Sequence, residues 1–284
     1  MAVVWVSGAS SGLGLHTAQA LQQAGWQVVG GARSFAGDGS PGFTRLPLDV
    51  SDPASIAAFC DEATQRFGPP EALVNAAGII TLGACEDLSE QELARVMDVN
   101  FLGMTRMVKA ALPLMRAQGR GKIVNFSSIN GLLATPFQGA YTASKHAIEG
   151  YSQALRMEVA PWQIQVMVVQ PGDHSGGQDK YRARAARPCG AYEAACHRAT
   201  GIIARDEQGG SDPAALGRKV AKAMGKSRLP QYLRVAKLSQ HAAVWLHDLL
   251  PSRLFTRFLS SYYQVAHHQV SVGQDAAAKE DLKP

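Results

Sequence analysis

Short valine-rich segments alternate with longer amphipathic segments through the first 172 residues of this 284-residue chain. Strands are predicted at residues 3–7, 27–31, 72–75, 122–127 and 165–170. Helices are predicted between them, at residues 14–24, 53–67, 91–118 and 140–160. Such alternation is typical of βαβ units, and near-continuous apolar strands are typical of a parallel sheet that helices cover on both faces. The chain is therefore expected to adopt an α/β fold with a doubly wound parallel sheet.

The alternation ends at Gly172. Residues 173–213 are rich in Arg, Gly and Ala, and residues 213–224 have a helical pattern. A second amphipathic stretch at residues 240–263 is interrupted by Pro251. The second part of the chain is thus expected to be built mainly from helices and loops.

A single domain is expected, because one α/β domain routinely reaches this length and the composition is 46% hydrophobic. Residues 1–172 would form its core, residues 173–270 an extension of that core, and residues 271–284 a polar tail. The chain begins with a buried-strand pattern rather than a basic secretory signal, and it has no run of about 18 apolar residues. We expect a cytoplasmic protein without a membrane-spanning helix.

The formal net charge of +5 arises beyond residue 172, where 17 Lys and Arg stand against 10 Asp and Glu. Nucleic-acid binding would require basic side chains interleaved with stacking aromatics, or a recognised module, and the sequence has neither. The four cysteines are scattered and lack metal-ligand spacing: Cys60, Cys85, Cys189 and Cys196. Neither a nucleic-acid partner nor a metal site is predicted.

A glycine-rich turn follows the first predicted strand and opens the first predicted helix. Glycines permit a tight turn and let the backbone approach a pyrophosphate, while a helix N-terminus offers free N–H groups to phosphates. Such a turn can be purely structural, but its place after the first strand favours a nucleotide site. The predicted cofactor-binding residues in it are Gly8, Ser10, Ser11, Gly12, Leu13 and Gly14.

Two motifs carry a resemblance to a known family. The glycine spacing is G-x-x-x-G-x-G, and Asn75-Ala76-Ala77-Gly78 follows a later strand. With these motifs the chain resembles the short-chain dehydrogenase/reductase family over about residues 3–175. The resemblance implies a single-domain Rossmann fold, a nicotinamide cofactor, and a homodimer or homotetramer. It also implies that Asn75, Ala76 and Gly78 lie near the cofactor and steady the central sheet.

The end of the second predicted strand indicates which nicotinamide cofactor is used. An acidic residue there would bind the ribose 2′-hydroxyl, but the chain has Ala32, followed by Arg33 and Ser34. A guanidinium can hold a phosphate through two parallel hydrogen bonds, so we predict NADP(H), with Arg33 and Ser34 at its 2′-phosphate. The alternative is that Arg33 is an ordinary surface residue. Asp49 and Val50 resemble the family's adenine-flanking segment.

Tyr141 and Lys145 lie four residues apart in a predicted helix and therefore share one face. A free tyrosine has a pKa near about 10, and a neighbouring ammonium group would lower that pKa toward the working range. Such a pair on its own often marks no more than a solvated helix face. The pair nevertheless predicts Tyr141 as a proton-transfer residue.

The family resemblance adds two residues to this pair. Ser128, which follows the predicted strand at residues 122–127, matches the serine that orients the substrate. Asn100 matches a fourth catalytic residue, which links Lys145 to solvent through ordered water. The resemblance also implies that Lys145 bonds the nicotinamide ribose. The expected catalytic set is thus Asn100, Ser128, Tyr141 and Lys145.

The chain departs from the family pattern after the last core strand. The family has Pro-Gly-x-x-x-Thr, with the threonine at the nicotinamide carboxamide, whereas this chain has Gly176 at that position. Pro171 and Gly172 are retained, and Ser175 is the candidate replacement for the threonine. His174, Tyr181 and Tyr192 are candidates for a substrate pocket or ordinary loop residues. The basic run at residues 182–187 is expected to be a solvated face, with an acidic substrate or a membrane surface as the alternative.

The stretch from residue 246 to residue 255 resembles the C-terminal extension of hydroxysteroid and retinol dehydrogenases of the 17β-hydroxysteroid type. Such a lid suits a lipophilic substrate, because apolar side chains can cover it and exclude water. An amphipathic helix that contacts a membrane is one alternative, and packing on the protein's own core is another.

The predicted activity is that of an NADP(H)-dependent oxidoreductase, which interconverts a ketone or aldehyde and an alcohol. Its substrate would be a lipophilic small molecule, with steroids among the candidates. A non-catalytic dinucleotide sensor would keep the glycine turn but has no need of the four catalytic residues. A sugar-nucleotide epimerase or dehydratase on a related fold is the third hypothesis, although such chains tend to have a larger C-terminal substrate domain.

Overall fold

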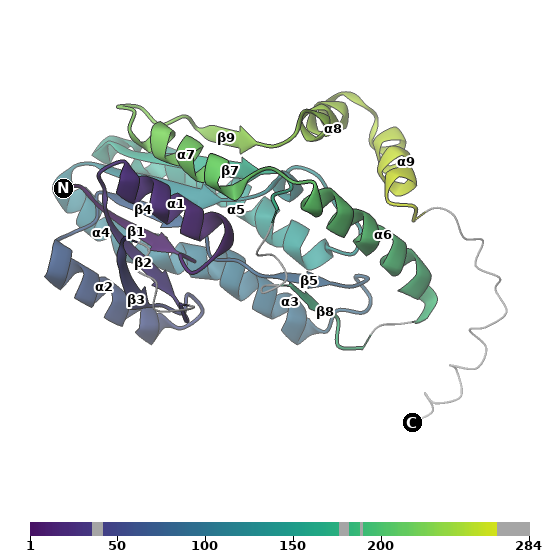
Figure 1. Cartoon of the computed structure of the whole chain (residues 1–284), viewed down its shortest axis with the longest axis horizontal. Coiled ribbons are helices and arrows are strands. Elements are labelled where there is room, and N and C mark those ends of the chain that lie inside the picture. Colours follow the sequence, from purple (N-terminus) through teal and green to yellow (C-terminus); the bar gives the residue numbers. More distant parts are fainter. Residues whose placement is uncertain (36–41, 176–181, 188–189, 266–284) are drawn as a thin grey trace.

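The computed structural model describes residues 1–35, 42–175, 182–187 and 190–265. In this part of the chain, seven strands form one parallel sheet in the order β3-β2-β1-β4-β6-β7-β9. The strands are β1 (Val3–Ser7), β2 (Gln27–Ala32), β3 (Thr44–Pro47), β4 (Ala72–Asn75), β6 (Gly121–Phe126), β7 (Ile164–Pro171) and β9 (Tyr232–Val235). The order reverses between β1 and β4, so the sheet is doubly wound, as predicted (Figure 1).

Helices cover both faces of the sheet because side chains along each strand alternate between the two faces. Val4 and Val6 of β1 belong to a core shared with α1 (Gly12–Gln23) and α7 (Pro213–Met224). Val3 and Trp5 belong to a second core on the opposite face. The helices packed there are α2 (Pro53–Phe67), α4 (Gly103–Gln118) and α5 (Gly139–Val159). The continuous valine runs thus reflect burial on both faces.

The observed elements follow the predicted ones closely in the first 172 residues, apart from one divided helix and two short strands, β3 and β5 (Ile80–Leu82), that were not predicted. The segment predicted as one helix at 91–118 is α3 (Glu90–Met97), a π-helical turn η1 (Asp98–Leu102) and α4. The short strand β3 was not predicted, and only one of its four residues is fully buried. Two 3-10 turns, η2 (Ile129–Gly131) and η3 (Ala160–Trp162), flank α5.

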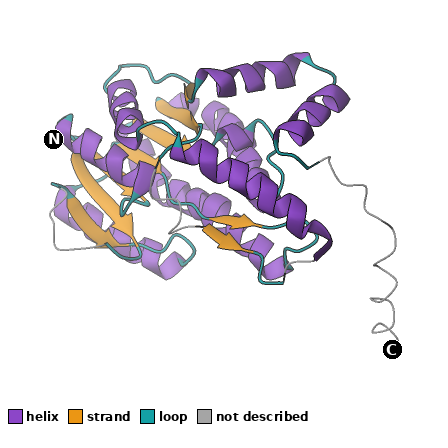
Figure 2. Cartoon of the chain, turned by 45° about the vertical axis from the view of Figure 1, so that its right-hand side comes forward, coloured by secondary structure: helices purple, strands orange, loops and turns teal. Residues whose placement is uncertain are grey.

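The chain beyond Gly172 contributes to the same sheet through β9, which pairs with β7. A small two-stranded parallel sheet, β5 (Ile80–Leu82) with β8 (Arg182–Arg184), lies beneath the long helix α6 (Gly190–Gln208) (Figure 2). The helices α8 (Leu238–Leu249) and α9 (Ser252–Tyr262) stand beyond the end of the sheet, joined at Pro251 (Figure 1). The predicted tail 271–284 lies outside the described residues.

Among the described residues, no helix is both long enough and apolar enough to cross a lipid bilayer.

Candidate active site

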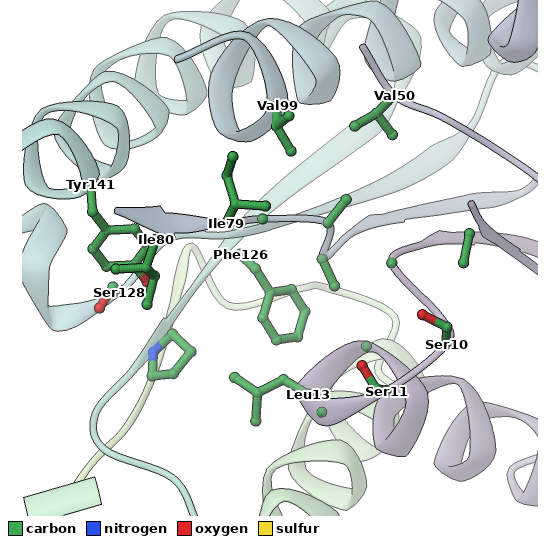
Figure 3. A pocket seen from close by; sticks show the side chains of 18 of the residues that line it. Ser10, Ser11, Leu13, Val50, Ile79, Ile80, Val99, Phe126, Ser128 and Tyr141 are labelled. Atoms are coloured by element: carbon green, nitrogen blue, oxygen red, sulfur yellow. The ribbon is translucent and has the colours of Figure 1, made fainter. Parts of the chain in front are cut away.

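A cleft of about 410 Å³ opens at the carboxyl ends of β1, β2, β4, β6 and β7, where the strand order reverses. Open parallel sheets bind ligands at this point. Most of the predicted site residues line it (Figure 3). They are Gly8, Ser10, Ser11, Gly12, Leu13, Gly14, Arg33, Ser34, Asp49, Val50, Ala76, Gly78, Ser128, Tyr141, Lys145, Pro171 and Gly172.

The glycine turn is held against the segment after β4 by close backbone packing. Gly8 has a φ of +75°, and a β-carbon added to it would lie 2.6 Å from the backbone nitrogen of Ala77. A β-carbon on Gly14 would overlap the carbonyl oxygen of Gly8. By contrast, a β-carbon on Gly12 would meet nothing within 4 Å. Gly8 and Gly14 therefore close the turn, and Gly12 leaves open space in front of it.

The start of α1 fits a phosphate group. Ser11 is the N-cap residue of α1, yet its side chain makes no capping hydrogen bond. Its Oγ is buried without a hydrogen-bond partner among the described residues. Buried hydroxyls are normally paired, so a bound acceptor such as a phosphate oxygen would satisfy this one. The free N–H groups of the first helical turn would bind the same anion.

Arg33 and Ser34, which follow β2, and Asp49, which follows β3, line the cleft. The Asp49 carboxylate accepts hydrogen bonds from the backbone N–H and the hydroxyl of Ser51, at 2.9 Å and 2.5 Å. These bonds, together with the charge of Arg33, lower the pKa of Asp49. Arg33 and Ser34 are exposed at the end of β2, so both can reach a ligand that lies along the cleft. The donors present fit a dinucleotide.

Tyr141 and Ser128 face each other at the far end of the cleft (Figure 3). The Ser128 side chain lies close enough to the Tyr141 hydroxyl to oppose the rise in its pKa. Ser128 caps the 3-10 turn η2, where its Oγ accepts from the N–H of Asn130 at 3.1 Å. One turn along α5 from Tyr141, the Lys145 Nζ lies 5.4 Å from the centre of the tyrosine ring. Lys145 also donates to the carbonyl oxygen of Phe126 at 2.8 Å.

The pKa of Tyr141 moves in the direction opposite to the expected one. Burial raises it to about 12, and the negative charges of Glu207 and Asp173 add to that effect. The hydrogen bond from Ser128 lowers it but does not compensate. Burial also lowers the pKa of Lys145 to about 8, against the raising effect of Glu149. Tyr141 is therefore protonated at neutral pH and can act as an acid.

Asn100 lies in the π-helical turn η1 and is fully buried. Its Oδ1 accepts from the N–H of Ile79 at 2.7 Å, and its Nδ2 donates to the Ile79 carbonyl at 2.9 Å and to Ser144 Oγ at 3.0 Å. The structure places Asn100 behind Gly78 rather than in the cleft wall. A β-carbon on Gly78 would lie 3.4 Å from the Asn100 Oδ1 and 3.9 Å from the Lys145 Nζ.

A second cavity of about 250 Å³ adjoins the cleft. The residues that line both spaces are Ile80, Ser128, Tyr141 and Gly172. Its apolar wall includes Leu133, Ile203, Phe258 and Leu259, and its polar end includes Asp173, Asp206, Glu207 and Lys237. Most of these side chains come from α6, α8 and α9 or the segments next to them. The extension beyond residue 172 thus builds a chamber in front of the tyrosine.

Some predicted residues lie elsewhere. Asn75 is buried behind the cleft, where it donates to Asn125 Oδ1 at 2.9 Å and so braces β4 against β6. Ser175 does not line the cleft, whereas its neighbour His174 does. Tyr192 is exposed and donates to Glu86 at 2.7 Å. Gly176 and Tyr181 lie outside the described residues, as does Cys189.

The basic run at 182–187 is only partly the solvated face that was expected. Arg182 forms an ion pair with Glu207 at 2.6 Å, and both side chains are largely buried. Apart from the pocket candidate His174, the remaining cleft residues were not predicted from the sequence. They are mainly apolar: Ala32, Leu48, Ala77, Ile79, Ile80, Val99 and Phe126, with Ser127. In the sequence, such apolar side chains follow the same pattern as the residues of the core. No sequence signal therefore distinguished the residues that line the cleft from those that are buried in the core.

Comparisons with known proteins agree with this geometry. The family model described as short chain dehydrogenase matches residues 2–183. A 3-ketodihydrosphingosine reductase from Bacteroides thetaiotaomicron is 35% identical over 265 residues, which cover 93% of this chain and 98% of that protein. Dehydrogenase/reductase SDR family member 7B from Bos taurus is 38% identical over 186 residues, which cover 60% of this chain and 57% of that protein.

The fold is also that of solved structures. The crystal structure of a short-chain dehydrogenase from Streptomyces avermitilis superposes with a TM-score of 0.77 at 28% identity. The superposition covers 93% of this chain and 97% of that one, so it includes the region beyond residue 172.

Proposed function

The chain belongs to the short-chain dehydrogenase family, and we propose that it is an NADP(H)-dependent oxidoreductase that interconverts a lipophilic ketone or aldehyde and its alcohol. One observation carries the proposal. Tyr141 and Ser128 line both the cleft and the second cavity, so they lie where the two spaces meet. A carbonyl group in the second cavity would therefore lie within reach of both hydroxyl groups and of a cofactor bound in the cleft.

In the reductive direction, the Tyr141 and Ser128 hydroxyls hydrogen-bond the carbonyl oxygen and polarise it. The bound cofactor supplies the hydride that forms the new C–H bond. As the carbonyl π electrons move onto oxygen, the Tyr141 Oη–H bond breaks and its proton forms the alcohol O–H bond. The Lys145 ammonium, one turn away, stabilises the phenolate left on Tyr141. Asn100 holds the Ile79 backbone and Ser144 in place around this pair.

The preference for NADP(H) rests on the end of β2. Ala32 stands where an acidic residue would repel a 2′-phosphate, and the cationic Arg33 follows it at the cleft. Arg33→Asp should raise the KM for NADPH by about 10-fold or more, because it replaces a charge-assisted hydrogen bond with repulsion. The KM for NADH should change little. Steady-state kinetics with both cofactors test this, and a preference for NADPH that survives the substitution would contradict the role of Arg33.

The character of the second cavity supports a lipophilic substrate with a polar group. One wall is apolar, from Leu133 to Leu259, whereas the other end carries carboxylates and Lys237. The relative from Bacteroides is named for the reduction of a keto-sphingoid lipid, which supports placing the substrate among long-chain ketones. Steroids are a second group of candidates.

The test is NADPH oxidation across a panel of long-chain keto lipids, steroids, quinones and short polar ketones. We expect the highest kcat/KM with a long-chain or steroid ketone. Activity confined to the short polar ketones would contradict the lipophilic assignment. Absence of turnover with every compound, although NADPH binds, would favour a dinucleotide sensor.

A further inference from the structure

The outer side of α8 exposes large apolar side chains. Leu238, Trp245 and Leu249 are 86%, 71% and 77% exposed. With Ala242 they follow the spacing i, i+4, i+7 and i+11, which places them within roughly 60° of one another around the helix. These four residues form one stripe, called here the α8 stripe.

The opposite side of α8 already packs on the protein. Val244 is buried in a cluster with Leu133 and Phe255. Gln240 and Ala243 line the second cavity. A surface helix with one buried apolar side normally carries polar residues on the other side. The α8 stripe therefore belongs neither to the core nor to the wall of the cavity, and a contiguous exposed apolar patch of this kind marks an interaction surface.

The charges nearby favour an anionic lipid surface as the partner. From Lys237 to Tyr262 the segment carries three cationic residues and one acidic residue, Asp248. Two of the cations, Arg253 and Arg257, are exposed one turn apart on α9. Apolar side chains that include a tryptophan, next to basic residues, are typical of helices that lie in a membrane interface. Both helices stand away from the sheet (Figure 1), so they can reach a flat surface.

We propose that the α8 stripe docks on the surface of an anionic lipid bilayer, with Arg253 and Arg257 near the headgroups. The helix would lie in the interface without spanning it. Because Gln240 and Ala243 on the inner side of α8 line the second cavity, docking would bring this cavity close to dissolved lipid. The docking surface stands on its own observations, whereas its use in delivering a substrate rests on the proposed function.

Vesicle co-sedimentation of the full chain tests the proposal. The probes are phosphatidylcholine vesicles with and without phosphatidylserine. We expect binding to the anionic vesicles, reduced about 10-fold or more in the double variant Trp245→Ser/Leu249→Ser. Arg253→Gln/Arg257→Gln should lose about 10-fold on the anionic vesicles only. Met157→Ser is the matched control, because Met157 is 73% exposed on α5 and should leave binding unchanged.

Three outcomes would overturn the proposal. They are no binding of the wild-type chain to anionic vesicles, equal loss in the Met157 control, or a wild-type dimer in solution that the double variant converts to a monomer without any vesicle binding. The last result would make the stripe an interface between two copies. Thermal unfolding and reduction of a water-soluble ketone should be the same in the double variant and the wild type. A chain that binds vesicles yet reduces no ketone would refute the proposed function and leave the docking surface intact.

Discussion

The hydroxyl of Tyr141 receives opposing influences from its neighbours. Burial and the carboxylates of Glu207 and Asp173 keep the proton on the oxygen, whereas the hydrogen bond from Ser128 makes its loss easier. The result is a tyrosine with a pKa of about 12, which is a proton donor at neutral pH. This protonation state suits reduction. Oxidation would require the phenolate form of Tyr141 and therefore a lower pKa. A cofactor bound near Lys145 would change the charge around the tyrosine hydroxyl.

Replacing the hydroxyl tests its role directly. Tyr141→Phe should lower kcat/KM for ketone reduction by about 10²–10⁴-fold, because it removes the proton donor and one carbonyl hydrogen bond. The cofactor should bind with nearly unchanged affinity, because the ring and the glycine turn remain. Stopped-flow NADPH oxidation and a fluorescence titration measure the two quantities. A variant that keeps more than a few per cent of the activity would refute the assignment.

Glu149 adds a prediction about pH. It is buried one turn beyond Lys145 on α5, accepts from Gln170 Nε2 at 3.1 Å, and raises the pKa of Lys145. Burial raises the pKa of Glu149, whereas its hydrogen bonds and the charges of His146 and Arg234 oppose that rise. With a pKa of about 8, Lys145 keeps its ammonium group below that pH and loses it above. Activity that depends on the ammonium should therefore decline on the alkaline side.

Glu149→Gln should move this alkaline decline to lower pH, since it removes the negative charge that stabilises the ammonium. We expect a loss of roughly two- to tenfold in kcat/KM at pH 8, with little loss near pH 6. The matched control is Glu158→Gln, because Glu158 is exposed on the same helix. A uniform loss at all pH values would instead indicate a purely structural role for Glu149.

At the scale of elements, the fit between α1 and α7 positions the glycine turn. A β-carbon on Gly217 of α7 would overlap the carbonyl oxygen of His16 in α1. The two helices therefore approach closely only because residue 217 is glycine. Since α1 begins at Gly12, its packing on α7 fixes the helix start that faces the cleft.

Gly217→Ala should accordingly destabilise the protein by about 1–3 kcal/mol, because it forces the two helices apart. The expected fall in Tm is roughly 2–4 °C per kcal/mol. The control is Gly201→Ala in α6, where an added β-carbon would meet nothing within 4 Å. That change should be neutral or slightly stabilising, because alanine has the higher helix propensity. Calorimetry decides, and equal Tm values for the two variants would contradict the packing argument.

The elements that could be predicted were those with a strong periodic pattern. Strands β1 and β4 and helix α2 have the predicted bounds, since both faces of β1 and β4 are buried and α2 is punctuated at both ends by proline and glycine. Strand β9 was missed because three of its four residues are not fully buried. Helix α6 was missed because its small and charged residues give it no clear apolar stripe.

The residues of the candidate site also fall into those that could be predicted from the sequence and those that could not. Tyr141, Lys145 and Ser128 carry chemistry at a fixed spacing, so the sequence was sufficient to find them. The second cavity could not be predicted, because its walls combine Leu133 with Ile203 and Phe258, which are distant in the chain and carry no reactive group. The π-helical turn that holds Asn100 also has no marker in the helical pattern around it.

For the whole molecule, the chamber in front of Tyr141 has a cost in stability. Asp173 lies at the polar end of the second cavity, where burial and the charges of Glu207 and Asp206 raise its pKa to about 6. Lys237 and the hydrogen bond from Gln240 lower that pKa but do not cancel the rise. The folded state therefore favours the neutral carboxyl group, and near neutral pH the ionised group opposes folding.

The raised pKa of Asp173 makes the free energy of unfolding depend on pH. The folded pKa of about 6 lies above the ordinary aspartate value of 3.8, so the contribution of Asp173 to stability is fully present below about pH 4 and is lost as the pH rises through about 6. Asp173→Asn replaces the carboxyl group by a neutral amide, so the variant has no ionised group at this position that opposes folding. The variant should be more stable than the wild type at pH 7 by about 1–3 kcal/mol, and this gain should shrink toward pH 4.

Denaturant unfolding at both pH values measures the difference, provided that the unfolding is reversible and two-state. Asp248→Asn is the control, because the Asp248 side chain is 68% exposed and should show no pH-dependent gain. A stabilisation of the Asp173 variant that is equal at pH 4 and pH 7 would contradict the ionisation argument. If the gain appears only at pH 7, the carboxylate is kept near Tyr141 at the expense of stability, as expected for a group that acts on the substrate rather than on the fold.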